Sequence, residues 1–237
     1  MMLFAFCQYL DLVKNLIYNI NILTKGMIEI NNSYKTVRGF GEAEIVEKRS
    51  RFIASVKPVT TEKEAEEYIN HLRKEYWDAR HNVYAYILRE NNIMRYSDDG
   101  EPAGTAGVPV LDILKKEELT DLIVVVTRYF GGILLGTGGL VHAYSKSAKE
   151  GLAAAGIKTR VLCREILIKC DYTLLGKVQY EVASFSSAVC GDIIYGEAVE
   201  MSVFVPAEDE EKFIKFIVDK TNAKAETSLK EIKYMDR

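Results

Sequence analysis

The chain has 237 residues, which predicts one or two domains. Hydrophobic residues make up 48% and charged residues 27%, a balance that is typical of globular proteins and excludes disordered, collagenous and low-complexity chains. The net charge of −3 excludes a strongly basic nucleic-acid binder but not a local basic patch.

Residues 1–26 form an apolar, Asn-rich extension that Asp11 and Lys14 interrupt. Its apolar runs are shorter than the roughly 18 residues of a membrane span, and it lacks the basic start and cleavage site of a secretory signal. Either it forms an amphipathic helix or it is not native sequence. We hypothesise that translation begins at Met27, and we expect no membrane association.

The first domain is expected at residues 27–158, with an α+β fold whose helices lie on one face of a sheet. Strands are expected within 33–58, at 81–89 and near Tyr96. The pattern Thr61-x-x-Glu64 is a capping box and predicts the start of a helix.

A second helix is expected at 105–116, and Leu122 to Val126 is a continuous apolar run that predicts a central strand buried on both faces. A third helix is expected after the glycine-rich loop and ends at Gly156. Small residues on one side of this helix, at Ala143, Ser147 and Gly151, suit close packing against the sheet.

The second domain is expected at residues 159–237. Its alternating and helical patterns follow the order βαββαβ, which is the ferredoxin-like arrangement. Residues 27–156 and residues 157–237 each carry a net charge of −2, so neither expected domain is basic as a whole.

Four cysteines, at positions 7, 163, 170 and 190, form neither a CxxC motif nor a cluster with zinc spacing. Reduced thiols fit a chain of this size better than a disulfide framework does. We therefore expect a cytoplasmic protein with no metal and no cofactor. Cys163 and Cys170 are interpreted as buried or half-buried small hydrophobic residues.

A glycine-rich segment follows the central strand. A strand, a glycine-rich loop and a helix N-terminus together can bind an anion through free backbone amides, and an arginine can add a bidentate contact. The segment matches neither a Walker A motif nor GxGxxG, and a tight strand–helix turn is the alternative. The candidate anion-binding residues are Arg128, Gly131, Gly132, Gly136, Thr137, Gly138 and Gly139.

A polar stretch precedes the second helix. Three carboxylates within four residues can bind a divalent cation or transfer protons, but Asp-Asp-Gly is also ordinary turn chemistry, which we favour. No nucleophile–base pair is visible, so no catalytic residue is assigned. The candidate residues of a polar pocket are His81, Ser97, Asp98, Asp99, Glu101, Thr105 and Lys146.

Two long motifs, SDDGEPAGTAGVPVL and VVVTRYFGGILLGTGGLVHAYS, resemble the signatures of the IMPACT/YigZ family. Arg80-His81-Asn82 resembles a third, shorter motif, and the resemblance covers about residues 34–237. It implies a first domain like the second domain of small-subunit ribosomal protein five. It also implies a second domain like a ferredoxin-like domain of elongation factor G.

The eukaryotic relative dampens amino-acid-starvation signalling by competing with the starvation kinase for its ribosome-associated activator, through an additional interaction domain with no match here. Bacterial members are thought to bind nucleic acid or ribosomes, and the family brings no catalytic residues. We therefore expect a non-catalytic cytoplasmic protein linked to translation or its regulation. It would bind a ribosome, RNA or a translation-factor partner around Arg128–Gly139, with RNA contacts at Lys48, Arg49 and Arg51.

Two other interpretations remain open. The chain is an enzyme or sensor for a small phosphorylated ligand or nucleotide, with Asp98, Asp99 and Glu101 holding a divalent cation. Alternatively, both motifs serve only to build the fold.

Overall fold

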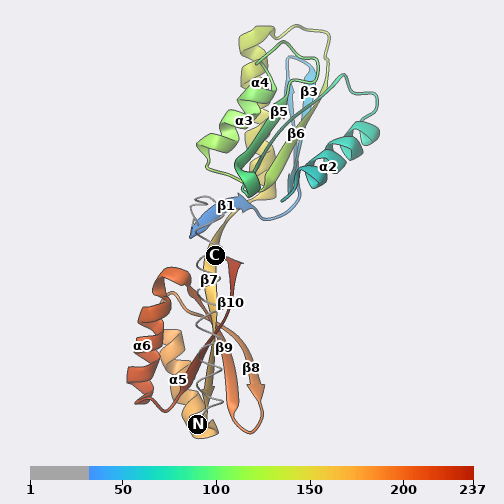
Figure 1. Cartoon of the computed structure of the whole chain (residues 1–237). Coiled ribbons are helices and arrows are strands. Elements are labelled where there is room, and N and C mark those ends of the chain that lie inside the picture. Colours follow the sequence, from blue (N-terminus) through green and yellow to red (C-terminus); the bar gives the residue numbers. More distant parts are fainter. Residues whose placement is uncertain (1–31) are drawn as a thin grey trace. The chain divides into compact units, whose positions relative to one another are not determined.

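The computed structural model describes residues 32–237, and the expectations for residues 1–26 and Met27 lie outside this part of the chain. Two five-stranded sheets carry the fold, and every strand pair in them is antiparallel. The helices pack on these sheets (Figure 1), which confirms the predicted α+β class.

The first sheet has the strand order β2–β3–β6–β4–β5. Its strands are β2 (Gly41–Glu47), β3 (Ser50–Pro58), β4 (His81–Leu88), β5 (Ile93–Ser97) and β6 (Leu122–Tyr129), and a short 3₁₀ turn, η1 (Glu90–Asn92), joins β4 to β5. Residues Leu122 to Val126 are all buried in the central strand β6, as predicted.

Helices cover both faces of this sheet, and the expectation that they lie on one face is wrong. Helices α3 (Gly107–Lys116) and α4 (Gly136–Ala155) pack on one face, and α2 (Glu62–Glu75) packs on the other. The reason lies in β6, where Val124 points into the cluster under α3 and α4 while Ile123 and Val125 point into the cluster under α2. Because both faces of the strand are apolar, both need a cover.

Helix α2 begins with the predicted cap. The Thr61 hydroxyl accepts a hydrogen bond from the Glu64 backbone N–H at 3.2 Å, and the Glu64 carboxylate accepts one from the Thr60 N–H at 2.6 Å. The second bond, together with weaker ones, holds the pKa of Glu64 below its ordinary value.

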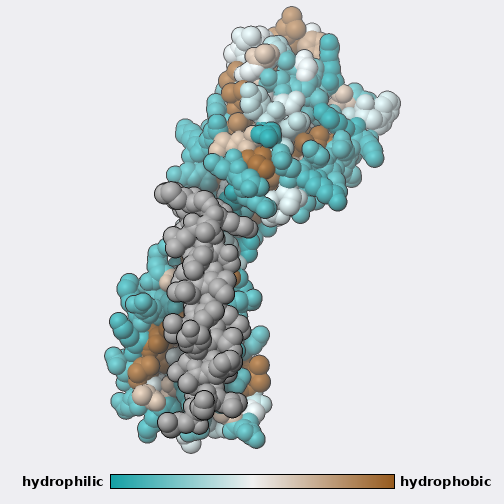
Figure 2. All heavy atoms as spheres, in the orientation of Figure 1, coloured by the Kyte–Doolittle hydropathy of each residue, from teal (hydrophilic) through white to brown (hydrophobic). Residues whose placement is uncertain are grey.

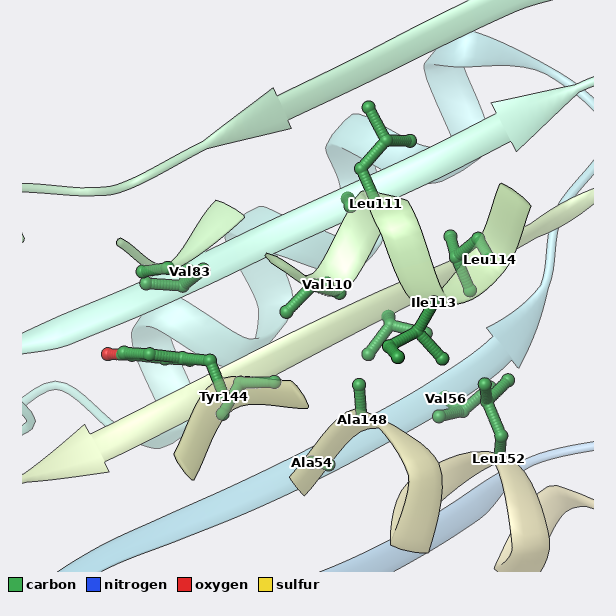
Figure 3. Close-up of a cluster of buried hydrophobic side chains, with 14 of the residues drawn as sticks. Ala54, Val56, Val83, Val110, Leu111, Ile113, Leu114, Tyr144, Ala148 and Leu152 are labelled. Atoms are coloured by element: carbon green, nitrogen blue, oxygen red, sulfur yellow. The ribbon is translucent and has the colours of Figure 1, made fainter. Parts of the chain in front are cut away.

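Helix α4 approaches the sheet closely. Figure 3 shows Ala148 and Leu152 of α4 lying over Ala54 and Val56 of β3, beside side chains of α3. A Cβ atom on Gly151 would lie 2.8 Å from the Cβ of Ala54, so a glycine is needed at this contact. Gly151, on the predicted small side of the helix, thus lies against β3.

The second sheet has the strand order β8–β9–β7–β10, with α5 and α6 packed on one face. Its elements are β7 (Ile157–Cys170), α5 (Tyr172–Ser184), β8 (Val189–Tyr195), β9 (Val199–Pro206), η2 (Ala207–Asp209), α6 (Glu210–Thr221) and β10 (Glu226–Asp236). This order and connection confirm the ferredoxin-like prediction.

Strand β1 (Ser33–Val37) belongs to the second sheet although it comes first among the described elements. It pairs with the first residues of β7, from Ile157 to Val161, and β9 pairs with β7 from Cys163 onward. The expected domain boundary near residue 158 falls at the start of β7 and stays a prediction.

Cys163 and Cys170 are buried, as expected, and burial raises the pKa of both thiols. Among the helices of residues 32–237, none is both long and apolar enough to cross a bilayer.

We expect Gly151→Ala to lower the free energy of unfolding by about 1–3 kcal/mol, because the added methyl overpacks the contact with Ala54 and Val56. The matched control is Gly176→Ala in α5, where a Cβ meets no atom within 4 Å. That substitution should raise stability by about 0.5–1 kcal/mol through helix propensity. Urea unfolding of both variants measures the difference, and equal effects would contradict the close helix–sheet contact.

Candidate functional site

A buried ion pair lies at the end of β6. The Arg128 side chain is 7% exposed and the Glu101 side chain 4%, and Nη1 of Arg128 donates to Oε1 of Glu101 at 2.5 Å. The sequence led us to expect Arg128 as a clamp for an external anion. In the structure its guanidinium binds an internal carboxylate instead.

Three other groups complete this buried network. The Tyr144 hydroxyl donates to the same Glu101 oxygen at 2.8 Å, and Nη2 of Arg128 lies 3.5 Å from the Ser50 hydroxyl. The guanidinium also lies 5.3 Å from the centre of the Phe52 ring. Nε of Arg128 is buried with no hydrogen-bond partner. The network therefore joins β3, β6, the polar stretch before α3, and α4.

Asp98 fixes the start of α3. Its carboxylate accepts hydrogen bonds from the backbone N–H groups of Gly104 and Gly107, both at 2.8 Å, and of Ala106 at 3.1 Å. The Ala106 and Gly107 N–H groups are donors that a helix N-terminus leaves without intrahelical partners, and a negative charge is favourable there. Asp98 thus acts as a helix cap supplied from a preceding turn.

Asp99 ties the same turn to β4 and α2. Its carboxylate accepts from the Asn82 N–H at 2.6 Å and from the Arg73 guanidinium at 2.9 Å. Nδ1 of His81 donates to the Asp99 carbonyl at 2.7 Å, and Nε2 of His81 lies 3.8 Å from Glu101. The structure therefore brings His81, Asp99 and Glu101 together, and their role as a polar pocket stays a prediction.

The remaining predicted residues of that pocket are less connected. The Ser97 hydroxyl accepts from the Asp99 N–H at 3.1 Å, and the Thr105 hydroxyl donates to the Pro102 carbonyl at 2.7 Å. Both are therefore parts of the turn. Lys146 lies exposed on α4, and no hydrogen bond or ion pair joins it to the rest of this group.

The glycine-rich loop contacts the turn between β2 and β3 through Gly131. A Cβ on Gly131 would lie 2.0 Å from the backbone carbon of Arg49, and the Gly131 N–H donates to Ser50. Gly132 and Gly136 have φ angles of +82° and +73°, which favour glycine. These observations explain part of the glycine content by backbone conformation and close approach.

The N-terminus of α4 is open to solvent. Gly136, Thr137 and Gly138 are exposed, Gly139 is half-buried, and no side chain caps the helix. Gly138 has open space where a Cβ would be, so the close-approach argument does not apply to it. From Thr127 to Lys149 the chain contains no Asp or Glu. This first turn therefore offers free amides in a segment without acidic side chains.

Cationic side chains surround the same end of the sheet. Lys48 and Arg49 form the β2–β3 turn, and Arg80 donates its backbone N–H to the Arg128 carbonyl. Among the described residues, no carboxylate forms an ion pair with any of these three side chains, whereas Arg51 pairs with Glu44 at 2.9 Å. We call this region the sheet-end surface, which comprises Lys48, Arg49, Arg51, Trp77, Arg80 and residues 130–139.

The face of the molecule drawn in Figure 2 is mostly hydrophilic, with separate small hydrophobic areas. The sheet-end surface contributes several exposed apolar side chains, at Trp77, Phe130, Ile133 and Leu134. Sequence reasoning missed Trp77 and Arg80 as surface-forming residues. Both lie between α2 and β4, where no periodic pattern marks them.

Within residues 32–237, no three His, Cys, Asp or Glu side chains gather as ligands for a metal ion. The three acidic residues of the polar stretch bind protein groups: Asp98 binds backbone amides, Asp99 binds an arginine and an amide, and Glu101 binds Arg128 and Tyr144. The arrangement suits a rigid binding surface better than proton transfer.

Two family models match the chain. Residues 48–152 match the Impact N-terminal domain, and residues 168–224 match a domain of unknown function (DUF1949). The chain is 44% identical over 207 residues to the IMPACT family member YvyE of Bacillus subtilis, a match that covers 87% of this chain and 95% of that protein.

A further relative and a solved structure agree with these matches. IMPACT family member YigZ of Escherichia coli is 32% identical over 175 residues, covering 73% of this chain and 85% of that protein. A solved structure titled "Crystal structure of an hypothetical protein" superposes with a TM-score of 0.54 at 28% identity, covering 85% of this chain and 99% of that one.

We expect Glu101→Ala to lower the free energy of unfolding by about 3–5 kcal/mol, because it leaves the Arg128 charge buried without a partner. The double variant Glu101→Leu with Arg128→Met removes both charges and should lie within about 2 kcal/mol of the wild type. Urea unfolding tests both variants. A double variant as unstable as the single one would show that packing, not charge, governs this position.

Burial, together with the nearby Glu101 carboxylate, raises the pKa of Tyr144 far above its usual value. A tyrosine with a raised folded-state pKa contributes stability that is complete below the unfolded pKa of about 10 and is lost as the pH rises further. We expect Tyr144→Phe to reduce the loss of unfolding free energy above pH 10 by about 1.4 kcal/mol per pH unit.

Urea unfolding at pH 9, 10 and 11 measures this slope. Tyr180→Phe is the matched control, since Tyr180 is 72% exposed on α5. Equal slopes for wild type and Tyr144→Phe would contradict the burial argument.

Proposed function

Because this chain belongs to the IMPACT family, we propose that it is a non-catalytic protein linked to translation or its regulation, and that it binds RNA of the translation apparatus through the sheet-end surface. The translation link rests on the family resemblance of the two long motifs. The choice of RNA rests on the charge of this surface.

The observation that carries the proposal is a group of cations that form no ion pair among the described residues. Arg49 lies against Gly131 of the loop that leads into α4, and Arg80 donates its backbone N–H to the Arg128 carbonyl. RNA phosphates are recognised by such cations and by helix N-termini. A narrow patch of this kind suits a domain whose net charge is negative overall.

The conformation of the β2–β3 turn supports the same proposal. Lys48 and Arg49 have φ angles of 45° and 66°, so two cationic residues occupy left-handed positions that Asn and Gly adopt at lower cost. Residues held in such conformations cluster at functional sites. The turn therefore presents its charges at a cost in stability of about 1 kcal/mol per residue.

The alternative of an enzyme or sensor for a phosphorylated ligand has less support. It requires Asp98, Asp99 and Glu101 to hold a cation, and each of these carboxylates already binds protein donors. A non-catalytic role agrees better with a network whose charges are paired internally.

The double variant Lys48→Asn with Arg49→Gly tests the proposal. Asn-Gly is the preferred sequence for a two-residue turn, so we expect the variant to be more stable than the wild type and yet to bind RNA more weakly. Co-sedimentation of the full chain with purified bacterial ribosomes, at several salt concentrations, measures the binding. The slope of log K against log salt should fall by about 1–2 because two phosphate contacts are lost.

A matched control removes the same charge elsewhere. Lys115→Gln with Lys116→Gln changes two exposed lysines in the last turn of α3, before β6 begins. It should bind like the wild type. No co-sedimentation of the wild type at low salt, or equal binding by the turn variant, would refute the proposal.

A further inference from the structure

Two neighbouring aliphatic side chains, Ile133 and Leu134, lie exposed in the loop between β6 and α4, and we call this pair the loop tip. Ile133 is 40% exposed and Leu134 is 84% exposed, the largest exposed fraction of any large hydrophobic side chain within residues 32–237. Burial of such side chains is favourable, and the free chain forgoes this gain at the loop tip. The gain remains available to a partner that covers the two residues.

The loop is anchored on both sides of the tip. Before the tip, the Gly131 N–H donates to the Ser50 hydroxyl at 3.1 Å, and a Cβ on Gly131 would overlap the β2–β3 turn. After the tip, Leu135 is buried in the core cluster under α3 and α4. Because both anchors are fixed to the first sheet, docking of the tip on a partner would order little further backbone.

RNA alone does not account for an aliphatic tip. Proteins bind RNA bases by stacking on aromatic rings or guanidinium planes and by hydrogen bonds, and they bind phosphates through cations and amides. The side chains of Ile133 and Leu134 offer neither a flat ring nor a hydrogen-bond donor. Adjacent exposed aliphatic side chains instead suit a contact with an apolar protein surface.

The charges around the tip indicate what borders that surface. From Thr127 to Lys149 the chain contains no Asp or Glu, and Lys48 and Arg49 form no ion pair among the described residues. A partner that meets this region therefore gains from anionic groups beside the apolar contact. Where a ribosomal protein lies next to RNA, the phosphates supply those anionic groups.

We propose that Ile133 and Leu134 dock into an apolar pocket of a ribosomal protein, while the cationic β2–β3 turn contacts the phosphates of RNA that borders the pocket. This inference rests on the proposed function and adds a protein contact to its RNA contact. The two contacts differ in their response to salt, because phosphate contacts release counterions whereas burial of an aliphatic side chain does not.

Leu134→Gln tests the inference in the full chain, with purified bacterial ribosomes and with protein-free RNA extracted from them as the two ligands. Loss of one buried leucine should weaken co-sedimentation with ribosomes at least about tenfold. The slope of log K against log salt should keep its wild-type value, because no charge is removed. Binding to the extracted RNA, measured by filter retention, should not change.

Two control variants accompany this test. Leu134→Met keeps an apolar side chain of similar volume and should bind ribosomes within about threefold of the wild type. Leu229→Gln makes the same change at a leucine that is 48% exposed on β10 of the second sheet, and it should bind like the wild type. Equal losses on ribosomes and extracted RNA, or no loss with Leu134→Gln, would overturn the inference.

The outcomes separate the two proposals. If the wild type binds neither ligand, the proposed function fails and the loop-tip inference fails with it. If the turn variant at Lys48 and Arg49 weakens binding while Leu134→Gln does not, only the loop-tip inference fails. If the wild type binds ribosomes but not extracted RNA, the choice of RNA fails, and the effect of Leu134→Gln on ribosome binding still decides the protein contact.

Discussion

The burial of one charge pair constrains the whole end of the first sheet. The Arg128 and Glu101 side chains are 7% and 4% exposed, so both charges are almost completely removed from water. This removal costs several kcal/mol per charge unless the two groups pair closely and form further hydrogen bonds. Compensation requires that β6, α4 and the turn before α3 meet at fixed positions, because Glu101 also accepts a hydrogen bond from the Tyr144 hydroxyl. If this turn moved away, the buried Arg128 charge would lose its carboxylate partner. Asp98 and Asp99 secure the same turn to α3, β4 and α2.

This rigid interior determines what is left for the surface. The Arg128 guanidinium binds Glu101, and the cationic residues of the sheet-end surface that form no ion pair among the described residues are Lys48, Arg49 and Arg80. The loop between Phe130 and Leu135 runs over the β2–β3 turn at a distance that only Gly131 allows. The exposed loop and the cationic turn are therefore held against each other, and a ligand that contacts one meets the other without prior rearrangement.

Much of the fold could be predicted because its hydrophobic and small residues recur at the spacings of helices and strands. The run Leu122 to Val126, the small side of α4 and the βαββαβ order all appear where their patterns place them. The face covered by α2 was predicted wrongly, although the two apolar sides of β6 contained the information. The partner of Arg128 could not be predicted, because a charge beside a glycine-rich loop has the same sequence pattern whether it faces solvent or a buried carboxylate. Trp77 was missed since a single exposed ring has no period.

The pairing of β1 with β7 has a consequence for the order in which the chain folds during synthesis. Ser33 pairs with Val161, so β1 leaves the ribosome long before the strand that completes its hydrogen bonds exists. The strands of the first sheet, β2 to β6, all leave the ribosome before β7, so this sheet forms earlier. Until Ile157 to Val161 emerge, β1 exposes an unpaired strand edge, which is the kind of edge that aggregates. The nascent chain therefore passes through a stage in which β1 has emerged and β7, the strand with which it pairs, has not.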